Sequence, residues 1–269
     1  IGIGAILGAP FMLGTLAMFI TGFAAWILRG RKTGRKIMHV DAVDMKRDLH
    51  FFICMYLLVI AAAFLPQWSK RYIAILLILS YVRYAWNVAH SGNAISDDNL
   101  RPLYFSRRVT PSWFLILLQF GLGLGAIAGG AEYFVAGISR TAELYGMHPL
   151  VLSMIIAPIA TELPEKFNSV IWVSQGKDRL ALGNITGAMA FQSTMIPAMG
   201  MLLCDWTLTL SAGISSMFLL FSTAGLYITV CRKQCLPITA LIYCGLAYLG
   251  FLVVIPNVFN SYNFRLIII

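Results

Sequence analysis

The sequence predicts an all-α protein that crosses a membrane several times. Its 269 residues are 59% apolar and 12% charged, and the mean hydropathy is +0.79, which lies outside the range of soluble domains. The apolar residues gather in runs that can cross about 30 Å of hydrocarbon if tilted and re-entrant segments are allowed. We expect helices at residues 3–28, 51–66, 71–90, 112–137, 149–174, 182–204, 208–230 and 236–258.

Basic residues are distributed unequally between the two faces that these helices define. Fourteen of the 20 lysines and arginines fall at about 29–50, 91–111, 175–181 and 231–235, whereas the opposite face holds only Lys70, Arg71, Arg140 and Arg265. The positive-inside rule makes the first set cytoplasmic and places both termini outside. The net charge of +9 is therefore a topology signal, and we expect the lipid bilayer and transported cations, rather than nucleic acid, as partners.

The segment at 29–50 also carries three aspartates, Asp41, Asp44 and Asp48. We interpret it as a solvated loop that orients the chain, because mixed charges between apolar runs are usually hydrated.

The stretch Ala157–Ser169 is the most unusual in the chain, because it places two carboxylates and two prolines inside an apolar run. An ionised side chain at mid-bilayer depth costs at least about 2.5–3.5 kcal/mol, so Glu162 and Glu165 need a partner. Their spacing of i, i+3 puts them on one helix face, and Thr161 lies one turn before Glu165. A bound cation would compensate these acidic groups.

The two prolines strengthen the prediction of a cation site. Pro158 and Pro164 have no N–H, so each leaves a backbone carbonyl of the preceding turn without its helical donor. Such carbonyls are tolerated in a membrane when they line a cavity, as in the discontinuous helices of transporters. The alternative is a kinked packing helix whose glutamates are protonated or paired with Lys166 or an arginine of another span.

The first and sixth apolar runs resemble each other. Gly4-Ala5-Ile6-Leu7-Gly8-Ala9 aligns with Gly183-Asn184-Ile185-Thr186-Gly187-Ala188, which indicates an internal duplication. Three helices then run from each match to the end of its half, but only the second half has two helices before its match. The pattern predicts inverted repeats of five helices each, with about eight of the ten helices in this chain and the first two lacking.

The repeat divides the chain into three parts. We expect a partial first repeat of three helices at 1–90, a cytoplasmic connector at 91–111, and a complete second repeat of five helices at 112–269. Within the second repeat, Asn184, Ala188 and Gln192 form a stripe at i, i+4, i+8 that we expect to face the bundle interior. Gln192 could supply an amide oxygen to a cation opposite the two glutamates, or form an interhelical hydrogen bond without a ligand.

Residues 137–200 resemble the second α-repeat of the Ca2+/cation antiporter superfamily, which includes the sodium/calcium exchangers, and residues 4–15 show a weaker trace of the first repeat. The resemblance rests on Ala160-Thr161-Glu162-Leu163-Pro164-Glu165 and on Gly183-Asn184-Ile185-Thr186-Gly187-Ala188. It implies an inverted-repeat antiporter fold with a Ca2+ site at the bilayer centre. It also implies that Glu165 is the principal acidic Ca2+ ligand, that Thr161 contributes to Na+ sites, and that Ala157 offers its backbone carbonyl.

Several positions depart from the family pattern. Glu162 replaces a Na+-ligating serine, Ala188 another serine and Gln192 an Asn or Asp ligand, while Leu13 occupies the position equivalent to Gln192 in the first repeat. Fewer hydroxyls and an added carboxylate argue against the usual Na+ sites, because a buried glutamate can carry a proton instead.

We therefore expect an integral, multi-pass antiporter of a bacterial or archaeal plasma membrane that exchanges Ca2+, or another divalent cation, for Na+ or H+ by alternating access. The metal ligands would be Glu165, Glu162, Thr161, Gln192 and the Ala157 carbonyl, without a resident cofactor. A monovalent cation exchanger and a non-transporting degenerate homologue are the alternatives on this fold. Hydrolase and metalloprotease motifs are not seen in the sequence, so we do not expect an enzyme.

Overall fold

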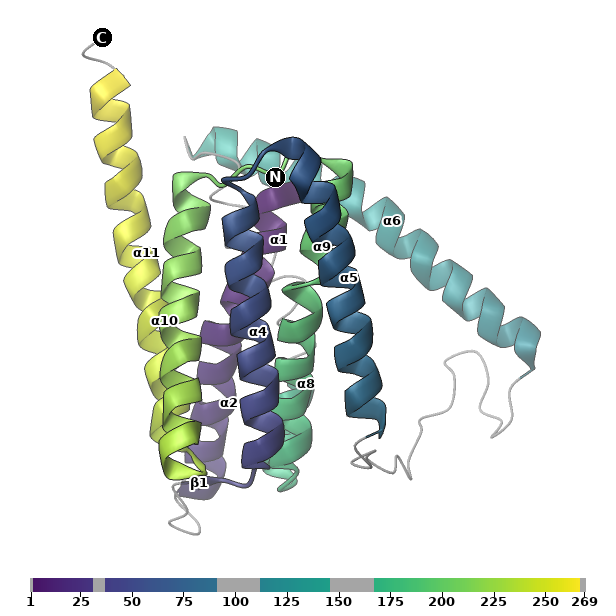
Figure 1. Cartoon of the computed structure of the whole chain (residues 1–269), viewed down its shortest axis with the longest axis vertical. Helices are drawn as coiled ribbons and strands as arrows, with labels where there is room; N and C mark the ends of the chain where they lie inside the picture. The colour runs from purple at the N-terminus through teal and green to yellow at the C-terminus, as the bar shows by residue number, and fades with distance from the viewer. Residues whose placement is uncertain (1, 31–36, 91–111, 146–166, 267–269) are drawn as a thin grey trace.

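The computed structural model of the chain describes residues 2–30, 37–90, 112–145 and 167–266. Long helices stand side by side in a bundle, and helix α6 diverges from it (Figure 1). Within the described residues, five helices are long and apolar enough to cross a membrane: Ile3–Leu28, Gln67–His90, Trp113–Leu144, Leu210–Lys233 and Ile238–Ile255. The all-α membrane fold expected from the apolar runs is confirmed.

The first helical passage extends from Gly2 to Gly30 without leaving helical geometry. It consists of α1 (Gly2–Met12), a π-helical turn η1 (Leu13–Ala17), α2 (Met18–Ala25) and a second π-helical turn η2 (Trp26–Gly30). This passage agrees with the predicted helix at 3–28.

Helix α4 (Ala42–Ala62) begins at Ala42 rather than at residue 51, so the predicted solvated loop was wrong over its second part. Asp41 is the N-cap and accepts a hydrogen bond from Val43 N at 2.9 Å, while Asp44 lies in the first turn. Both features stabilise a helix N-terminus. Helix α5 (Gln67–His90) then returns across the bundle.

The second part of the chain contains α6 (Trp113–Leu144), helical residues at 167–174, α8 (Asp178–Gln192), α9 (Met195–Leu203), α10 (Leu210–Lys233) and α11 (Ile238–Leu266). The predicted helix at 182–204 is thus two helices separated by Ser193 and Thr194. Most of the predicted helix at 149–174 lies outside the described residues.

Corresponding helices of the two halves pack in corresponding ways. Helix α1 packs on α10 and α8 on α4, α2 packs on α11 and α5 on α9, and α4 contacts α10 at the centre. In the repeat, the passage 2–30 corresponds to α8–α9, α4 to α10, and α5 to α11. Each of these contacts therefore has an equivalent in the other half, and the contact between α4 and α10 is its own equivalent. The passage 2–30 also runs opposite in direction to α8–α9 (Figure 1), as inverted repeats require. The repeat boundaries at residues 90 and 112 stay predictions.

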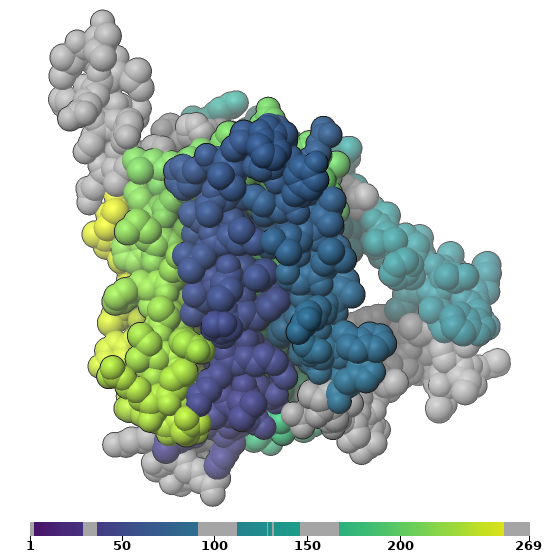
Figure 2. Space-filling model, in the orientation of Figure 1, coloured from purple at the N-terminus to yellow at the C-terminus, as the bar shows by residue number. Residues whose placement is uncertain are grey.

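The core is apolar and lies where these pairs meet. Phe11 stacks near Tyr248 and Phe251, with ring centroids 5.5 and 4.7 Å apart, and Leu49 and Leu219 are fully buried. Figure 2 shows one face of this assembly, on which α4 lies between α10 and α5.

Polar contacts join the helix ends on both sides of the bundle. At one side, β1 (Ile37–Met38) pairs antiparallel with β2 (Leu236–Pro237), the link between α10 and α11. At the other, Lys70 Nζ donates to the Trp206 carbonyl at 2.6 Å, and Trp206 Nε1 donates to Val59 O at 3.2 Å. The buried Lys70 ammonium thereby satisfies the carbonyl of Trp206, and the Trp206 indole satisfies the carbonyl of Val59 near the end of α4.

The close approach of α2 and α11 depends on Gly22. A Cβ at this position would lie 2.5 Å from Leu241 Cβ and 3.4 Å from the Ile238 carbonyl oxygen. We expect Gly22→Ala to lower the free energy of unfolding by about 1–3 kcal/mol, because the two helices have to separate. Thermal and denaturant unfolding in detergent measure the effect.

Gly225→Ala is the matched control, since an added Cβ there meets nothing within 4 Å. It should be neutral or slightly stabilising, because alanine has the higher helix propensity. An equal change in the free energy of unfolding for both variants would contradict the tight contact between α2 and α11.

Candidate functional site

In the described part of the chain, the passage 2–30 and the passage α8–α9 are each interrupted, and the interruptions lie at equivalent positions of the internal repeat. The π-helical turn η1 contains Thr15, and the gap between α8 and α9 contains Thr194, its counterpart in the aligned repeat. In Figure 1, α1 lies above α2 and α9 above α8, so both interruptions are near mid-height of the bundle. Irregular helical turns of this kind are frequent at functional sites.

The threonines at the two interruptions make the same hydrogen bond. Thr15 Oγ1 donates to Phe11 O at 2.5 Å, and Thr194 Oγ1 donates to Ala190 O at 2.7 Å. Both side chains are fully buried. Back-bonding to the carbonyl at i−4 supplies a donor where the regular ladder fails, and it bends the helix.

The carbonyls near the interruptions also have specific partners. Ser222 Oγ on α10 donates to Gly14 O at 2.8 Å, and a Cβ on Gly14 would collide with Leu219. In the second repeat, Ser193 Oγ donates to Ala190 O at 3.1 Å, and Pro197 cannot donate to the Ser193 carbonyl. The break between α8 and α9 thus lies about one turn before Pro197.

Gln192 ends α8 directly before the break, with 9% of its surface exposed. The other members of its predicted stripe, Asn184 and Ala188, are half-buried. Gln192 therefore lies inside the bundle at the expected depth, beside the interrupted turn.

The remaining predicted ligands, Ala157, Thr161, Glu162 and Glu165, lie outside the described residues. Their proximity to Gln192 stays a prediction. The next described segment starts at Phe167, and Ser169 Oγ donates to Ala181 O on α8 at 3.3 Å.

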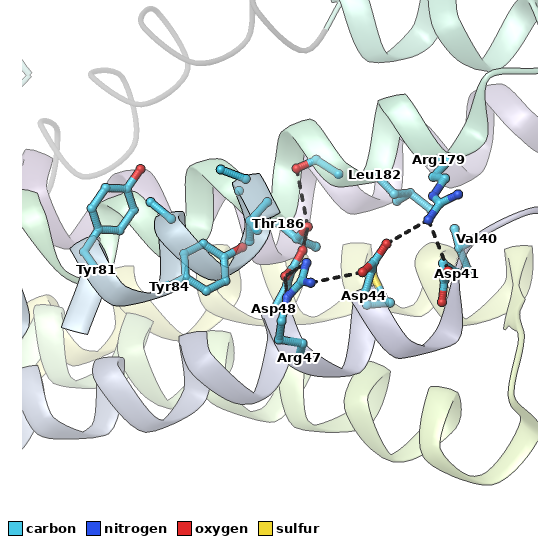
Figure 3. Close-up of a pocket in the computed structure, with 16 residues that line it drawn as sticks. Val40, Asp41, Asp44, Arg47, Asp48, Tyr81, Tyr84, Arg179, Leu182 and Thr186 are labelled. Carbon is cyan, nitrogen blue, oxygen red and sulfur yellow. Dashed lines mark hydrogen bonds and ion pairs between the residues drawn. The ribbon is translucent and has the colours of Figure 1, made fainter. Parts of the chain in front are cut away.

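Sequence reasoning missed a second polar cluster, in which α4 and α8 are joined by charged groups (Figure 3). Thr186 Oγ1 donates to Asp48 Oδ2 at 2.8 Å, and Arg47 donates to Asp48 Oδ1 from Nε at 3.1 Å and from Nη2 at 3.0 Å. Asp48 is only 7% exposed. Its three charge-assisted hydrogen bonds compensate for burial of the carboxylate.

The cluster continues to the end of the bundle. Arg47 Nη1 lies 3.1 Å from Asp44 Oδ1, and Arg179 Nη2 lies 2.9 Å from Asp44 Oδ2 and 3.1 Å from Asp41 Oδ2. The spacing of Asp41, Asp44, Arg47 and Asp48 at three or four residues is a helical signal that could have revealed α4. Hydropathy does not detect this signal, because the residues that carry it are charged.

Comparison with known proteins identifies the family. The sequence profile described as sodium/calcium exchanger protein matches residues 115–256, just over half of the chain. The chain belongs to the sodium/calcium exchanger family. This family consists of transporters rather than enzymes, and the matched region contains the predicted ligands at 157–165 and Gln192.

Relatives of the exchanger family include the putative antiporter CaxA of Alkalimonas amylolytica, 30% identical over 46% of this chain and 39% of the relative. An uncharacterized membrane protein of Methanocaldococcus jannaschii is 25% identical over 55% of this chain and 48% of its own length. The sodium/calcium exchanger MaX1 of Methanosarcina acetivorans is 33% identical over 28% of this chain and 21% of the exchanger. The chain thus spans less than half of each relative.

A solved structure shares the fold over nearly the whole chain. The crystal structure of the H+/Ca2+ exchanger CAX superposes with a TM-score of 0.68 and 14% identity, covering 93% of this chain and 64% of that structure. The inverted-repeat antiporter fold predicted from the duplication is therefore confirmed.

The link between Asp48 and Thr186 should contribute measurably to stability. Thr186→Val preserves the shape of a side chain that is 2% exposed but removes a donor to a buried carboxylate. We expect a loss of about 1–3 kcal/mol in the free energy of unfolding, measured by denaturant titration in detergent.

Thr229→Val serves as the control, because the Thr229 hydroxyl donates to the Gly225 carbonyl of its own helix, at 2.7 Å. Thr229→Val should lower the free energy of unfolding clearly less than Thr186→Val does. If both variants lost the same stability, the hydroxyl of Thr186 would have no special role in joining α4 to α8.

Proposed function

We propose that the protein is a secondary active antiporter that exchanges Ca2+, or another divalent cation, for Na+ or H+ by alternating access. The observation that carries the proposal is the pair of helix interruptions at equivalent repeat positions, with Gln192 buried beside one of them. Interrupted helices at mid-depth are where transporters coordinate ions. Family membership supports the same class of activity.

The proposed ligands are all oxygen donors. Glu165 and Glu162 would provide carboxylates, Thr161 a hydroxyl, Ala157 its carbonyl and Gln192 its amide oxygen. Hard oxygen ligands at an irregular, adaptable site suit Ca2+ better than soft metals. Competition of the two ions for the same carboxylates would couple their opposite fluxes.

The described part of the site favours H+ as the counter-ion. Leu13, which aligns with Gln192, and Met189, three residues before Gln192, are fully buried and apolar. Neither can replace the water around Na+ with a side-chain oxygen. A carboxylate that loses its divalent cation in such surroundings takes up a proton more readily, because desolvation disfavours its charged form.

Ion flux in proteoliposomes tests the proposal. We expect the full-length protein to take up Ca2+ when the lumen is acidic, and Glu165→Gln to abolish uptake because the principal ligand loses its charge. The control Glu132→Gln changes an exposed acid on α6 and should retain uptake. Uptake driven only by an outward Na+ gradient would assign Na+ as counter-ion, and absence of any ion-driven flux would favour the degenerate homologue.

Gln192 provides a second, finer test. Gln192→Leu removes the amide oxygen while keeping a similar volume. We expect the apparent KM for Ca2+ to rise by roughly 10–100-fold, the range for losing a group that orders a metal site. Gln175→Leu, in an exposed turn, should leave the KM unchanged, and equal KM values for all three proteins would remove Gln192 from the site.

A further inference from the structure

A separate cavity of about 500 Å³ lies between α4, α5 and α8. Its α8 lining consists of residues at helical spacing on one face: Arg179, Leu182, Gly183, Thr186 and Gly187. At 100° per residue, Asn184, Ala188 and Gln192 fall on the opposite side of the helix. The cavity is therefore distinct from the candidate ion site.

The cavity changes from charged to apolar along the helices. Figure 3 shows Asp41 and Arg179 at one end, Arg47 and Asp48 in the middle, and Tyr81 at the other end. The α5 lining runs along the whole cavity and is formed by Tyr81, Tyr84, Ala85, Val88 and Ala89. Tyr84 lies next to the charged middle, with Arg47 Cζ 5.9 Å from its ring centroid, so only Tyr81 lies beyond it.

This gradient follows the depth of the membrane. Asp41 caps the N-terminus of α4, whereas Tyr81 lies roughly 13 Å from the end of α5 at His90. Helix α5 is long and apolar enough to span the membrane. The apolar end of the cavity is thus bordered by hydrocarbon and its charged end by the headgroup region.

The charged end offers groups for both an anion and a cation. Arg179 uses Nη2 for its ion pairs with Asp41 and Asp44, and its Nε and Nη1 donate to none of the described residues. Its side chain is 49% exposed and that of Asp41 is 36% exposed. A guanidinium has five donors, so Arg179 can hold a phosphate while keeping its carboxylate partners.

The balance of charge favours a ligand that also carries an amine. Among the described residues, the lining contains three carboxylates, Asp41, Asp44 and Asp48, against the two guanidinium groups of Arg47 and Arg179. A purely anionic headgroup would be repelled by this excess of negative charge. A primary ammonium could instead donate to the Asp41 carboxylate, which a quaternary ammonium cannot do.

We propose that this cavity binds one phospholipid whose headgroup carries a phosphate and a primary amine. The phosphate contacts Arg179, the amine contacts Asp41, and an acyl chain lies along Tyr81 and the apolar side of α5. The bound lipid would fasten α5 to the α4–α8 pair. The assignment is independent of which ions the protein exchanges.

Lipid binding to the full-length protein tests the assignment. Delipidated protein in detergent is titrated with phosphatidylethanolamine, phosphatidylcholine or phosphatidylglycerol of identical acyl chains, and binding is followed by native mass spectrometry and by the unfolding temperature. We expect phosphatidylethanolamine to bind roughly tenfold tighter than the other two lipids, the effect of one charge-assisted hydrogen bond. Its binding should raise the unfolding temperature accordingly.

Asp41→Asn keeps an N-cap residue on α4 but should abolish this preference, because the amine loses its charged acceptor. Arg179→Gln should weaken binding of all three lipids, because they share the phosphate, and Arg140→Gln, at an exposed position of α6, should change neither property. Equal affinity of the unmutated protein for the three lipids, or tighter binding of phosphatidylglycerol, would overturn the proposal. This outcome does not depend on whether any variant folds. Water-soluble glycerophosphoethanolamine binding as tightly as the lipid would also overturn the proposal, because the acyl chain would then contribute nothing.

Discussion

The need to satisfy every backbone polar group inside the bilayer governs this structure. Two helices are interrupted at mid-height, where water is scarce, and each interruption is tolerable only because neighbouring hydroxyls supply donors. Thr15 and Thr194 do so within their own helices, and Ser222 does so for Gly14 from α10. The close packing of the first helical passage on α10 follows, because the Ser222 hydroxyl can donate to Gly14 O only at short range.

The two repeats use the same packing but different chemistry. Helix α8 is joined to α4 by a chain of carboxylates and guanidinium groups, including the buried Asp48. In the corresponding contact of the first helical passage with α10, Ser222 makes a neutral hydrogen bond to Gly14 O of η1, and Leu219 packs against Gly14. Removing one partner of a buried charged pair costs more than removing a neutral hydroxyl, so the second repeat tolerates less change at this contact.

Hydropathy predicted the long helices well, because membrane-spanning segments must be apolar over their full length. It failed at α4, whose first turns are charged and become helical through capping and ion pairs with Arg179 on a distant segment. The helical stripe predicted that Gln192 faces the bundle interior, where it is buried, and the duplication aligned the two interrupted turns. The geometry between Gln192 and the proposed ligands at 157–165 could not be predicted, since distances across a bundle depend on packing that single-helix patterns do not contain.

The small β1–β2 ribbon has a consequence for biogenesis. It pairs Ile37 and Met38, which follow the first helical passage, with Pro237 and Leu236, which precede the last helix. Because the second strand follows α10 in the sequence, the ribbon cannot close until the helices from α4 to α10 have emerged from the ribosome. The ribbon therefore forms after α10 has been made. A chain truncated before residue 236 would lack the strand that pairs with Ile37 and Met38.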